Sequence, residues 1–201
     1  MGYLIVSCSL KLTTIKINTH KEEHLHIQIA EHIKLAPLVE SDAAEILKTV
    51  NLSRASLGEF LPWVEGVNNI NSAKKYILDR VNSGLNGSRW FKIYYKGNLS
   101  GVFAVKSICP ELNIAELGYW LSSDAQGNGI ISQVITRVPS ILKNTSAKII
   151  EFRCLEKNEA SIKIALKSGA SLVGTIPNFV SVNNTIQQLN ILPSDFVNNP
   201  I

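Results

Sequence analysis

Residues 116–130 read Glu-Leu-Gly-Tyr-Trp-Leu-Ser-Ser-Asp-Ala-Gln-Gly-Asn-Gly-Ile, and this stretch decides the fold. An aromatic, apolar run typical of a strand leads into a polar turn and then into a pair of glycines that opens a helix. The first N–H groups of a helix have no helical partner, and the helix dipole adds positive potential there. The stretch therefore predicts an anion site, and a phosphorylated cofactor is the ligand that suits it.

The glycine pair, Gly127 and Gly129, allows backbone angles that are closed to other residues and leaves no side chain between the amides and a pyrophosphate. The turn lacks the Lys-Ser or Lys-Thr of a P-loop and the third glycine of the dinucleotide fingerprint. A bare Gly-x-Gly is a plain turn more often than a phosphate site. Its interpretation therefore depends on the elements around it.

The composition indicates a single folded domain. The chain has 201 residues, of which 45% are hydrophobic, which is ample material for a core. The net charge of +4 is spread along the chain, and no basic stripe is interleaved with aromatics, so we expect no direct nucleic-acid partner. Cys8, Cys109 and Cys154 show no CxxC spacing, which predicts neither a disulfide framework nor a zinc site and favours the reducing cytoplasm. No segment approaches the length of a membrane-spanning helix, so no membrane partner is expected.

We predict an N-terminal extension over residues 1–23, whose weak alternation would suit an added edge strand, one domain over 24–195, and a tail over 196–201. His24 and His26 would share one strand face and in principle could hold a metal. No cysteine or carboxylate lies at ligand spacing, so a solvated strand face is favoured and no metal is predicted.

The order of strands and helices predicts a mixed α/β fold. Short turns join the strand-like runs at 90–95, 99–107 and 114–121, so these should be antiparallel. The helix after Gly129 is interrupted by Pro139, which removes a backbone bond. The next elements should be a buried strand, a helix and two further strands, over 148–154, 158–167, 170–175 and 185–192. A β-α-β order implies locally parallel strands with a ligand beyond their carboxyl ends.

These residues resemble the GNAT superfamily of acyl-CoA-dependent N-acetyltransferases, and within it the ribosomal-protein N-terminal acetyltransferases of the RimJ/RimL type. The resemblance covers roughly residues 24–192 and rests on four stretches: 61–64 (Leu-Pro-Trp-Val), 115–121 (Ala-Glu-Leu-Gly-Tyr-Trp-Leu), 126–131 (Gln-Gly-Asn-Gly-Ile-Ile) and 158–162 (Asn-Glu-Ala-Ser-Ile). It implies a GNAT fold of the α+β class. Its central twisted sheet would be mostly antiparallel, with about six to seven strands, a parallel splayed pair in the middle and flanking helices.

The resemblance implies acetyl-CoA as the cofactor. The amides of the turn would hold the CoA pyrophosphate, and the edge of strand 114–121 would pair with the pantetheine arm. Asn158 and Ser161 match positions near the pantetheine and the thioester sulfur. The cofactor-binding residues expected on this basis are Trp120, Leu121, Gln126, Gly127, Asn128, Gly129, Ile130, Asn158 and Ser161.

The reaction would be attack of an amine on a thioester, which needs a proton acceptor, an oxyanion donor and a proton for the thiolate. Glu116, which should share a strand face with Gly118 and Trp120, is the first candidate for the base. The alternative is an ordinary exposed strand carboxylate. A backbone N–H near Trp120 or Leu121, exposed by a bulge, would bind the oxyanion. Ser161 is the candidate to protonate the thiolate, and its alternative role is hydrogen bonding at a helix start. Cys154 has no histidine after His32 to activate it, which indicates a buried structural cysteine.

The acceptor site is predicted around Trp63 and Glu65 in the loop at 61–66, with Tyr119 from the strand. A hydrophobic plug is an equal interpretation of Trp63. Some members of the branch carry a catalytic glutamate near Val180, which is one departure of this chain. The acceptor would be a protein N-terminal α-amine. The alternatives are a small amine, such as a polyamine, amino acid or aminoglycoside, and a non-catalytic CoA-binding module; the oligomeric state expected is a monomer or a homodimer.

Overall fold

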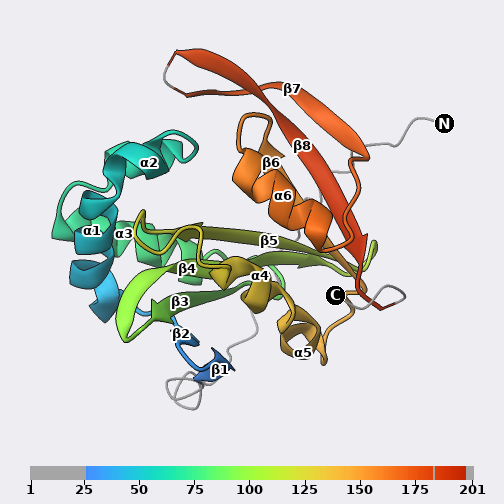
Figure 1. Cartoon of the computed structure of the whole chain (residues 1–201), viewed down its shortest axis with the longest axis horizontal. Helices are drawn as coiled ribbons and strands as arrows, with labels where there is room; N and C mark the ends of the chain where they lie inside the picture. The colour runs from blue at the N-terminus through green and yellow to red at the C-terminus, as the bar shows by residue number, and fades with distance from the viewer. Residues whose placement is uncertain (1–25, 183, 198–201) are drawn as a thin grey trace.

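The computed structural model describes residues 26–182 and 184–197, so the predicted extension over 1–23 and His24 lie outside the described residues. The chain forms one large sheet with helices on both faces (Figure 1). In chain order the elements are β1 (Ile27–Ala30), β2 (Ile33–Pro37), η2 (Glu40–Asp42), α1 (Ala43–Leu52), α2 (Arg54–Gly58), η3 (Pro62–Gly66), α3 (Ile70–Val81), β3 (Arg89–Tyr95), β4 (Asn98–Cys109), β5 (Ile114–Leu121), α4 (Ile130–Ile135), α5 (Val138–Leu142), β6 (Ile149–Leu155), α6 (Glu159–Lys167), β7 (Gly174–Val182) and β8 (Thr185–Asp195).

The described strands form an eight-stranded sheet in the order β1-β2-β3-β4-β5-β6-β8-β7. Neighbouring strands are antiparallel except for β5 and β6, which pair in parallel. The crossover from β5 to β6 runs through α4 and α5, as parallel strands require a long connection. The predicted mixed, mostly antiparallel sheet with a central parallel pair is confirmed, with one strand more than the six to seven expected.

Two apolar clusters lie on opposite faces of the sheet. On one face, called here the α1–α3 face, Val102 and Trp120 pack with α1, α2, η3 and α3. On the other, the α4–α6 face, Phe103 and Leu117 pack with α4, α5 and α6. Successive side chains of a strand point to opposite faces, so β4 and β5 supply both clusters. Each fully buried large side chain contributes about 1.5–3 kcal/mol of stability, which makes the twin cores the main support of the sheet.

The parallel pair separates at its end. The β5–β6 ladder runs from Ile114 opposite Ile149 to Leu117 opposite Phe152. On its other side β5 remains paired with β4 up to Leu121 opposite Gly101. Meanwhile β6 continues to Leu155 against β8. The last residues of β5 therefore have an open edge toward β6, as the expected splayed pair requires.

Two local predictions change. Pro139 does not kink one long helix: the chain forms α4 and then α5, with Pro139 in the first turn of α5, where its missing N–H is not needed. The strand predicted over residues 170–175 is wrong, because β7 begins at Gly174 and continues to Val182. Leu172 and Val173, which lie within the predicted strand, are more than half exposed.

No helix in the two described segments is long and apolar enough to cross a membrane.

Candidate active site

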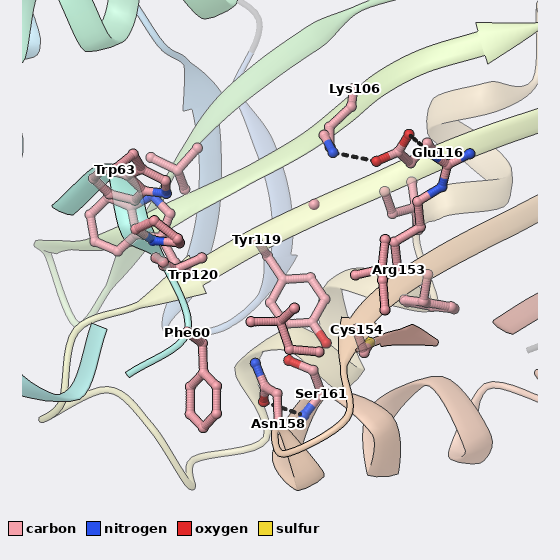
Figure 2. A pocket seen from close by; sticks show the side chains of 18 of the residues that line it. Phe60, Trp63, Lys106, Glu116, Tyr119, Trp120, Arg153, Cys154, Asn158 and Ser161 are labelled. Atoms are coloured by element: carbon pink, nitrogen blue, oxygen red, sulfur yellow. Dashed lines mark hydrogen bonds and ion pairs between the residues drawn. The ribbon is translucent and has the colours of Figure 1, made fainter. Parts of the chain in front are cut away.

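Two adjoining cavities open at the gap between β5 and β6. The larger, of about 470 Å³, extends along the α1–α3 face to Trp63 and Glu116 (Figure 2). The smaller, of about 220 Å³, extends to Gln126 and Gly127 in the glycine turn. Both cavities are lined by Phe60, Leu61, Tyr119, Trp120, Asn158 and Ser161. These six residues therefore mark the place where molecules bound in the two cavities would meet.

The two faces of β5 supply different parts of this site. Trp120 packs into the apolar cluster of the α1–α3 face, and Glu116 and Gly118 share its face by the two-residue alternation of a strand. This confirms that Glu116 and Trp120 lie on one strand face. Tyr119 and Leu121 pack against the opposite cluster. The larger cavity reaches both faces because it passes through the gap beyond Leu117.

The open edge of β5 presents the amides of Tyr119 and Leu121. An ideal Cβ on Gly101 of β4 would lie 2.1 Å from the Trp120 carbonyl oxygen, and Ser122 N donates to a β4 carbonyl at 2.8 Å. The backbone groups of Trp120 and Ser122 thus face β4. Because successive residues of a strand direct these groups to opposite neighbours, those of Tyr119 and Leu121 face the gap. The predicted donor at Trp120 points the wrong way, whereas Leu121 has the right direction.

The predicted bulge at Trp120 or Leu121 is not formed. The register between β4 and β5 shifts instead between Val105 and Ser107, so Lys106 is the extra residue. The aliphatic part of Lys106 crosses Gly118, where an added Cβ would be 2.8 Å from the Lys106 Cδ. A glycine at this position lets the lysine lie across β5 and reach the carboxylate beyond it.

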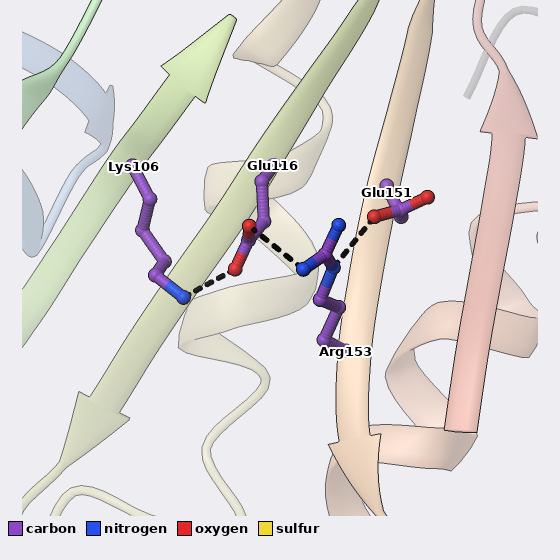
Figure 3. A network of polar contacts seen from close by, with 4 residues as sticks. All are labelled: Lys106, Glu116, Glu151 and Arg153. Atoms are coloured by element: carbon purple, nitrogen blue, oxygen red, sulfur yellow. Dashed lines mark hydrogen bonds and ion pairs between the residues drawn. The ribbon is translucent and has the colours of Figure 1, made fainter. Parts of the chain in front are cut away.

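Glu116 is part of a chain of ion pairs across three strands (Figure 3). Its Oε1 contacts Lys106 Nζ, and its Oε2 lies 3.6 Å from Arg153 Nη1. Arg153 Nε in turn donates to Glu151 Oε1 at 2.7 Å. Burial alone would lower the pKa of Arg153, but the charges of Glu116 and Glu151 outweigh it and raise that pKa above its usual range. With its side chain only 14% exposed and both oxygens facing cations, Glu116 is not an ordinary exposed strand carboxylate.

Sequence reasoning missed Lys106 and Arg153. Each follows apolar residues in a strand that reads as buried, which is the signal that could have drawn attention to them. Their meeting with Glu116 depends on pairing across β4, β5 and β6, which a pattern within one strand does not contain.

Tyr119 carries a buried hydroxyl that has no hydrogen-bond partner among the described residues. Its ring points toward Ser161 and Cys154 (Figure 2). Burial raises the pKa of the Tyr119 hydroxyl well above its usual value, and the Ser161 side chain, which lies near this hydroxyl without the geometry of a hydrogen bond, opposes the shift only in part. Burial also raises the pKa of the Cys154 thiol to about 11. Both groups are therefore protonated near neutral pH, and Cys154 is a buried thiol rather than a nucleophile.

Asn158 caps α6 and thereby leaves the Ser161 hydroxyl available. The Asn158 Oδ1 accepts a hydrogen bond from Ser161 N at 3.1 Å, which satisfies one of the orphan amides of the helix. The Ser161 hydroxyl itself makes no hydrogen bond to a described backbone group, so helix-start bonding is not its role. It lines both cavities.

The glycine turn has the backbone geometry that the sequence predicts. Gly127 and Gly129 have φ of 75° and 69°, in the left-handed region that favours glycine. The amides of residues 127–129 make no hydrogen bond within the described chain, and no protein atom lies within 4 Å of an ideal Cβ on Gly127. Ile130 begins α4 with its side chain buried in the core. The turn is therefore anchored on one side and open to a ligand on the other.

Two side chains hold this turn in place. The Asn128 amide donates to the carbonyls of Ala125 and Gln126 at 3.2 and 3.0 Å. The Gln126 amide donates to the Leu121 carbonyl at 3.1 Å, which ties the turn to the end of β5. These two predicted cofactor-binding residues thus act on the loop through their side chains, and Gln126 also lines the smaller cavity.

Of the three predicted acceptor residues, Trp63 and Tyr119 line the larger cavity and Glu65 does not. The half-buried Trp63 lines the larger cavity. Its ring centroid lies 4.4 Å from that of Tyr76 and 5.9 Å from that of Trp120, so Trp63 both lines the cavity and belongs to the apolar packing beside it. Glu65 is exposed and lines neither cavity, so the structure does not support its predicted role. Val180 lines the cavity as an apolar side chain. Within residues 26–182 and 184–197 no group of three potential metal ligands comes together.

Comparison with known proteins gives the site a context. The sequence pattern of the family described as "Acetyltransferase (GNAT) domain" matches residues 32–171. The chain is similar to the ribosomal-protein-serine acetyltransferase of Escherichia coli strain K12, at 25% identity over 167 residues that cover 82% of this chain and 93% of that protein.

Solved structures are similar over most of their length. A RimL ribosomal L7/L12 α-N-protein acetyltransferase in complex with coenzyme A has a TM-score of 0.78 at 21% identity, covering 85% of this chain and 98% of that one. The microcin C7 self-immunity acetyltransferase MccE, in complex with acetyl-CoA and AMP, has a TM-score of 0.75 at 24% identity, covering 84% and 95%. At these identities the structural similarity shows the fold alone.

Proposed function

The chain belongs to the GNAT acetyltransferase family and is an acetyl-CoA-dependent N-acetyltransferase, and from this premise we propose that it acetylates the N-terminal α-amine of a protein, a ribosomal protein first of all. The observation that carries the proposal is the pair of cavities that meet at the open edge of β5. A ribosomal acceptor would have the enzyme work in the cytoplasm.

The residues at the smaller cavity fit acetyl-CoA. The free amides of Gly127, Asn128 and Gly129 are donors suited to a pyrophosphate, and the amide of Ile130 continues the series at the helix start. The open edge of β5 offers backbone groups to an extended arm, as a strand edge does for an added strand. Acetyl-CoA supplies the acetyl thioester, which these contacts would bring to the residues shared by the two cavities.

The chain's own groups then account for the charges that develop. The amides of Tyr119 and Leu121 face the gap and would donate to the carbonyl oxygen as it becomes negative. Glu116 would take a proton from the acceptor amine, directly or through water, once the amine displaces one of its cationic partners. No metal is needed for these steps.

Two hydroxyls are available to protonate the leaving thiolate. Ser161 lies in the wall that both cavities share, and the buried hydroxyl of Tyr119 lies beside it without a hydrogen-bond partner in the described chain. The Tyr119 hydroxyl faces the cofactor side of β5, so we assign it to the thioester rather than to the acceptor.

The charges of the larger cavity favour a protein N-terminus over a polycation. A site for a polyamine or an aminoglycoside would gather carboxylates, but Glu65 lies outside the cavity and Glu116 is held by Lys106 and Arg153. The aromatic wall at Trp63 and Trp120 suits a peptide chain, whose α-amine is a single positive charge.

The test is thiol release from acetyl-CoA with peptides that carry ribosomal-protein N-terminal sequences, compared with spermidine and an aminoglycoside. We expect turnover on at least one peptide and none above background on the small polycations. If no N-terminal peptide is acetylated while calorimetry shows that acetyl-CoA still binds, the proposed acceptor is wrong.

A further inference from the structure

Arg80 stands in the wall of the larger cavity, away from the residues assigned to the reaction. It occupies the last turn of α3, where its Nη1 donates to the Tyr76 carbonyl at 2.9 Å. Its guanidinium lies over the Tyr76 ring, 3.6 Å from the centroid, and 5.3 and 5.5 Å from the centroids of Trp63 and Trp90. Three aromatic rings therefore fix the position of this cation beside the cavity.

No carboxylate of the described residues pairs with this guanidinium. In the described ranges no ion pair within 4.0 Å includes Arg80, and the neighbouring Asp79 is bound by Lys75 at 2.8 Å. A guanidinium offers five N–H donors, and one of them is used by the Tyr76 carbonyl. Burial lowers the pKa of Arg80, and the charge and hydrogen bonding of the Tyr76 side chain together with the charge of Asp79 oppose this only in part.

The cavity as a whole is cationic. Its charged lining residues are Arg80, Lys106 and Arg153 against the single carboxylate of Glu116, an excess of two positive charges. Lys106 and Arg153 are engaged by Glu116, so Arg80 is the cation left to bind a ligand among the described residues that line this cavity. A partly desolvated, unpaired charge costs free energy that an anion of the ligand would recover.

We infer that Arg80 is a specificity-determining residue that binds a carboxylate of the acceptor. The enzyme then selects amines whose parent molecule carries a carboxylate close to the amine. In a protein acceptor this group is an acidic side chain among the first few residues. The inference rests on the proposed function, because it concerns the acceptor of the same reaction.

A purely structural role for Arg80 predicts a different effect on the rates. Stacking on Tyr76 and bonding to its carbonyl would stabilise α3 and affect all acceptors equally. A carboxylate-binding role affects acidic acceptors alone. Hydrogen bonds to charged groups are strong enough that loss of this contact would lower kcat/KM by about 10- to 100-fold.

The experiment compares pairs of peptides that differ by Asp or Glu against Asn or Gln at positions two to four, and a dipeptide with a free carboxylate against its amide. The wild type is expected to prefer the acid of a peptide pair about tenfold or more. Arg80→Gln should abolish this preference by slowing the acidic peptide alone, and Arg80→Lys should keep part of it because the charge remains. Preference confined to the dipeptide pair would assign the carboxylate to a small acceptor and contradict the protein acceptor.

Lys74→Gln is the matched control, because it removes an exposed cation from the same helix that pairs with Glu40, and it leaves both the cavity and the Lys75–Asp79 pair intact. Thermal unfolding and CoA affinity of each variant check its fold. Equal rates of the wild type on acid and amide, or an equal loss on both in Arg80→Gln, would overturn the inference.

Peptide binding, followed by the fluorescence of the tryptophans beside Arg80, separates this inference from the proposed function. If no acetyl group is transferred to any acceptor, the proposed function fails. Tighter binding of the acidic peptide by the wild type, lost in Arg80→Gln, would still support the carboxylate site, and equal binding of acid and amide would overturn it.

Discussion

Leu117 of β5 lies opposite Phe152 of β6, and this is the last pair of their ladder. Because β5 keeps its pairing with β4 and β6 keeps its pairing with β8, the separation leaves one free strand edge inside the sheet. Both cavities open onto that edge. The predictions below address the groups placed around it.

Replacing Gly129 by valine should weaken CoA binding by about tenfold or more. The position has φ of 69°, and its Cβ would point into space that the protein leaves empty apart from the Gln133 side chain 3.9 Å away. The new side chain would therefore meet the ligand, and the strain of a left-handed β-branched residue would distort the amides, at about 1–3 kcal/mol. Calorimetry with CoA measures the effect.

Gly97→Val is the matched control for that variant. Gly97 has φ of 83°, has no atom within 4 Å of its ideal Cβ, and lies in the turn between β3 and β4. It should lose similar stability and keep its CoA affinity. Equal CoA affinity in both variants would show that the 126–130 turn does not bind the pyrophosphate.

Glu116→Gln should lower kcat about 10²- to 10⁴-fold, the usual range for loss of a general base, with CoA affinity unchanged. Glu151→Gln disturbs the same Arg153 without lining the cavity and should retain most of the rate. Rates are measured across pH with a saturating acceptor. A Glu116→Gln enzyme with an unaltered rate at every pH would remove Glu116 as the base.

Tyr119→Phe should separate stability from activity. An unpaired buried hydroxyl costs about 1–3 kcal/mol, so its removal should leave the free energy of unfolding unchanged or raise it by roughly 1 kcal/mol. The same change should lower kcat, because the cavity loses a proton donor beside Ser161. Denaturant unfolding and steady-state rates measure the two effects.

Ser161→Ala should lower kcat as well, and the double variant should show whether the two hydroxyls act together. Tyr94→Phe, which removes a tyrosine hydroxyl outside both cavities, is the control. Unchanged kcat in both Tyr119→Phe and Ser161→Ala would leave the thiolate to be protonated by solvent.

Cys154 should behave as an inert thiol. Its pKa of about 11 lies above the unfolded value near 9.0, so the folded state holds the proton more tightly. Its contribution to stability is thus fully present below about pH 9 and is lost as the pH rises toward 11. Alkylation of Cys154 at pH 8 should be slow, and Cys154→Ser should keep its kcat. Rapid modification of this residue in the native protein, located by mass spectrometry, would contradict this view.

The sequence was informative where one segment determines its own geometry. The alternation in residues 114–121 sufficed to place Glu116 and Trp120 on one face, and the two glycines after Gln126 sufficed to predict a turn with positive φ. These features depend on neighbours within a few residues. The cap of α6 by Asn158 is equally local, although it was not predicted.

The ion-pair partners of Glu116 could not be predicted from residues within a single strand. Lys106 reaches it because the register between β4 and β5 brings residues 106 and 107 to Glu116, and Arg153 reaches it because β6 pairs in parallel with β5. Counting along β4 from Val102 gives the correct face for Lys106 but the wrong one after the bulge, where Ile108 packs in the same cluster as Val105. The predicted acceptor role of Glu65 lacks support for a related reason, since η3 directs Trp63 to the cavity and leaves the Glu65 carboxylate in solvent.

The gap between β5 and β6 also bears on the order of events. Acceptor and acetyl-CoA would approach the shared wall at Tyr119 from different faces of one strand, so neither covers the entrance of the other. Without a thiolate to carry the acetyl group, both must be present together. We therefore expect initial-rate plots that intersect, the pattern of a ternary complex, rather than the parallel lines of a ping-pong enzyme.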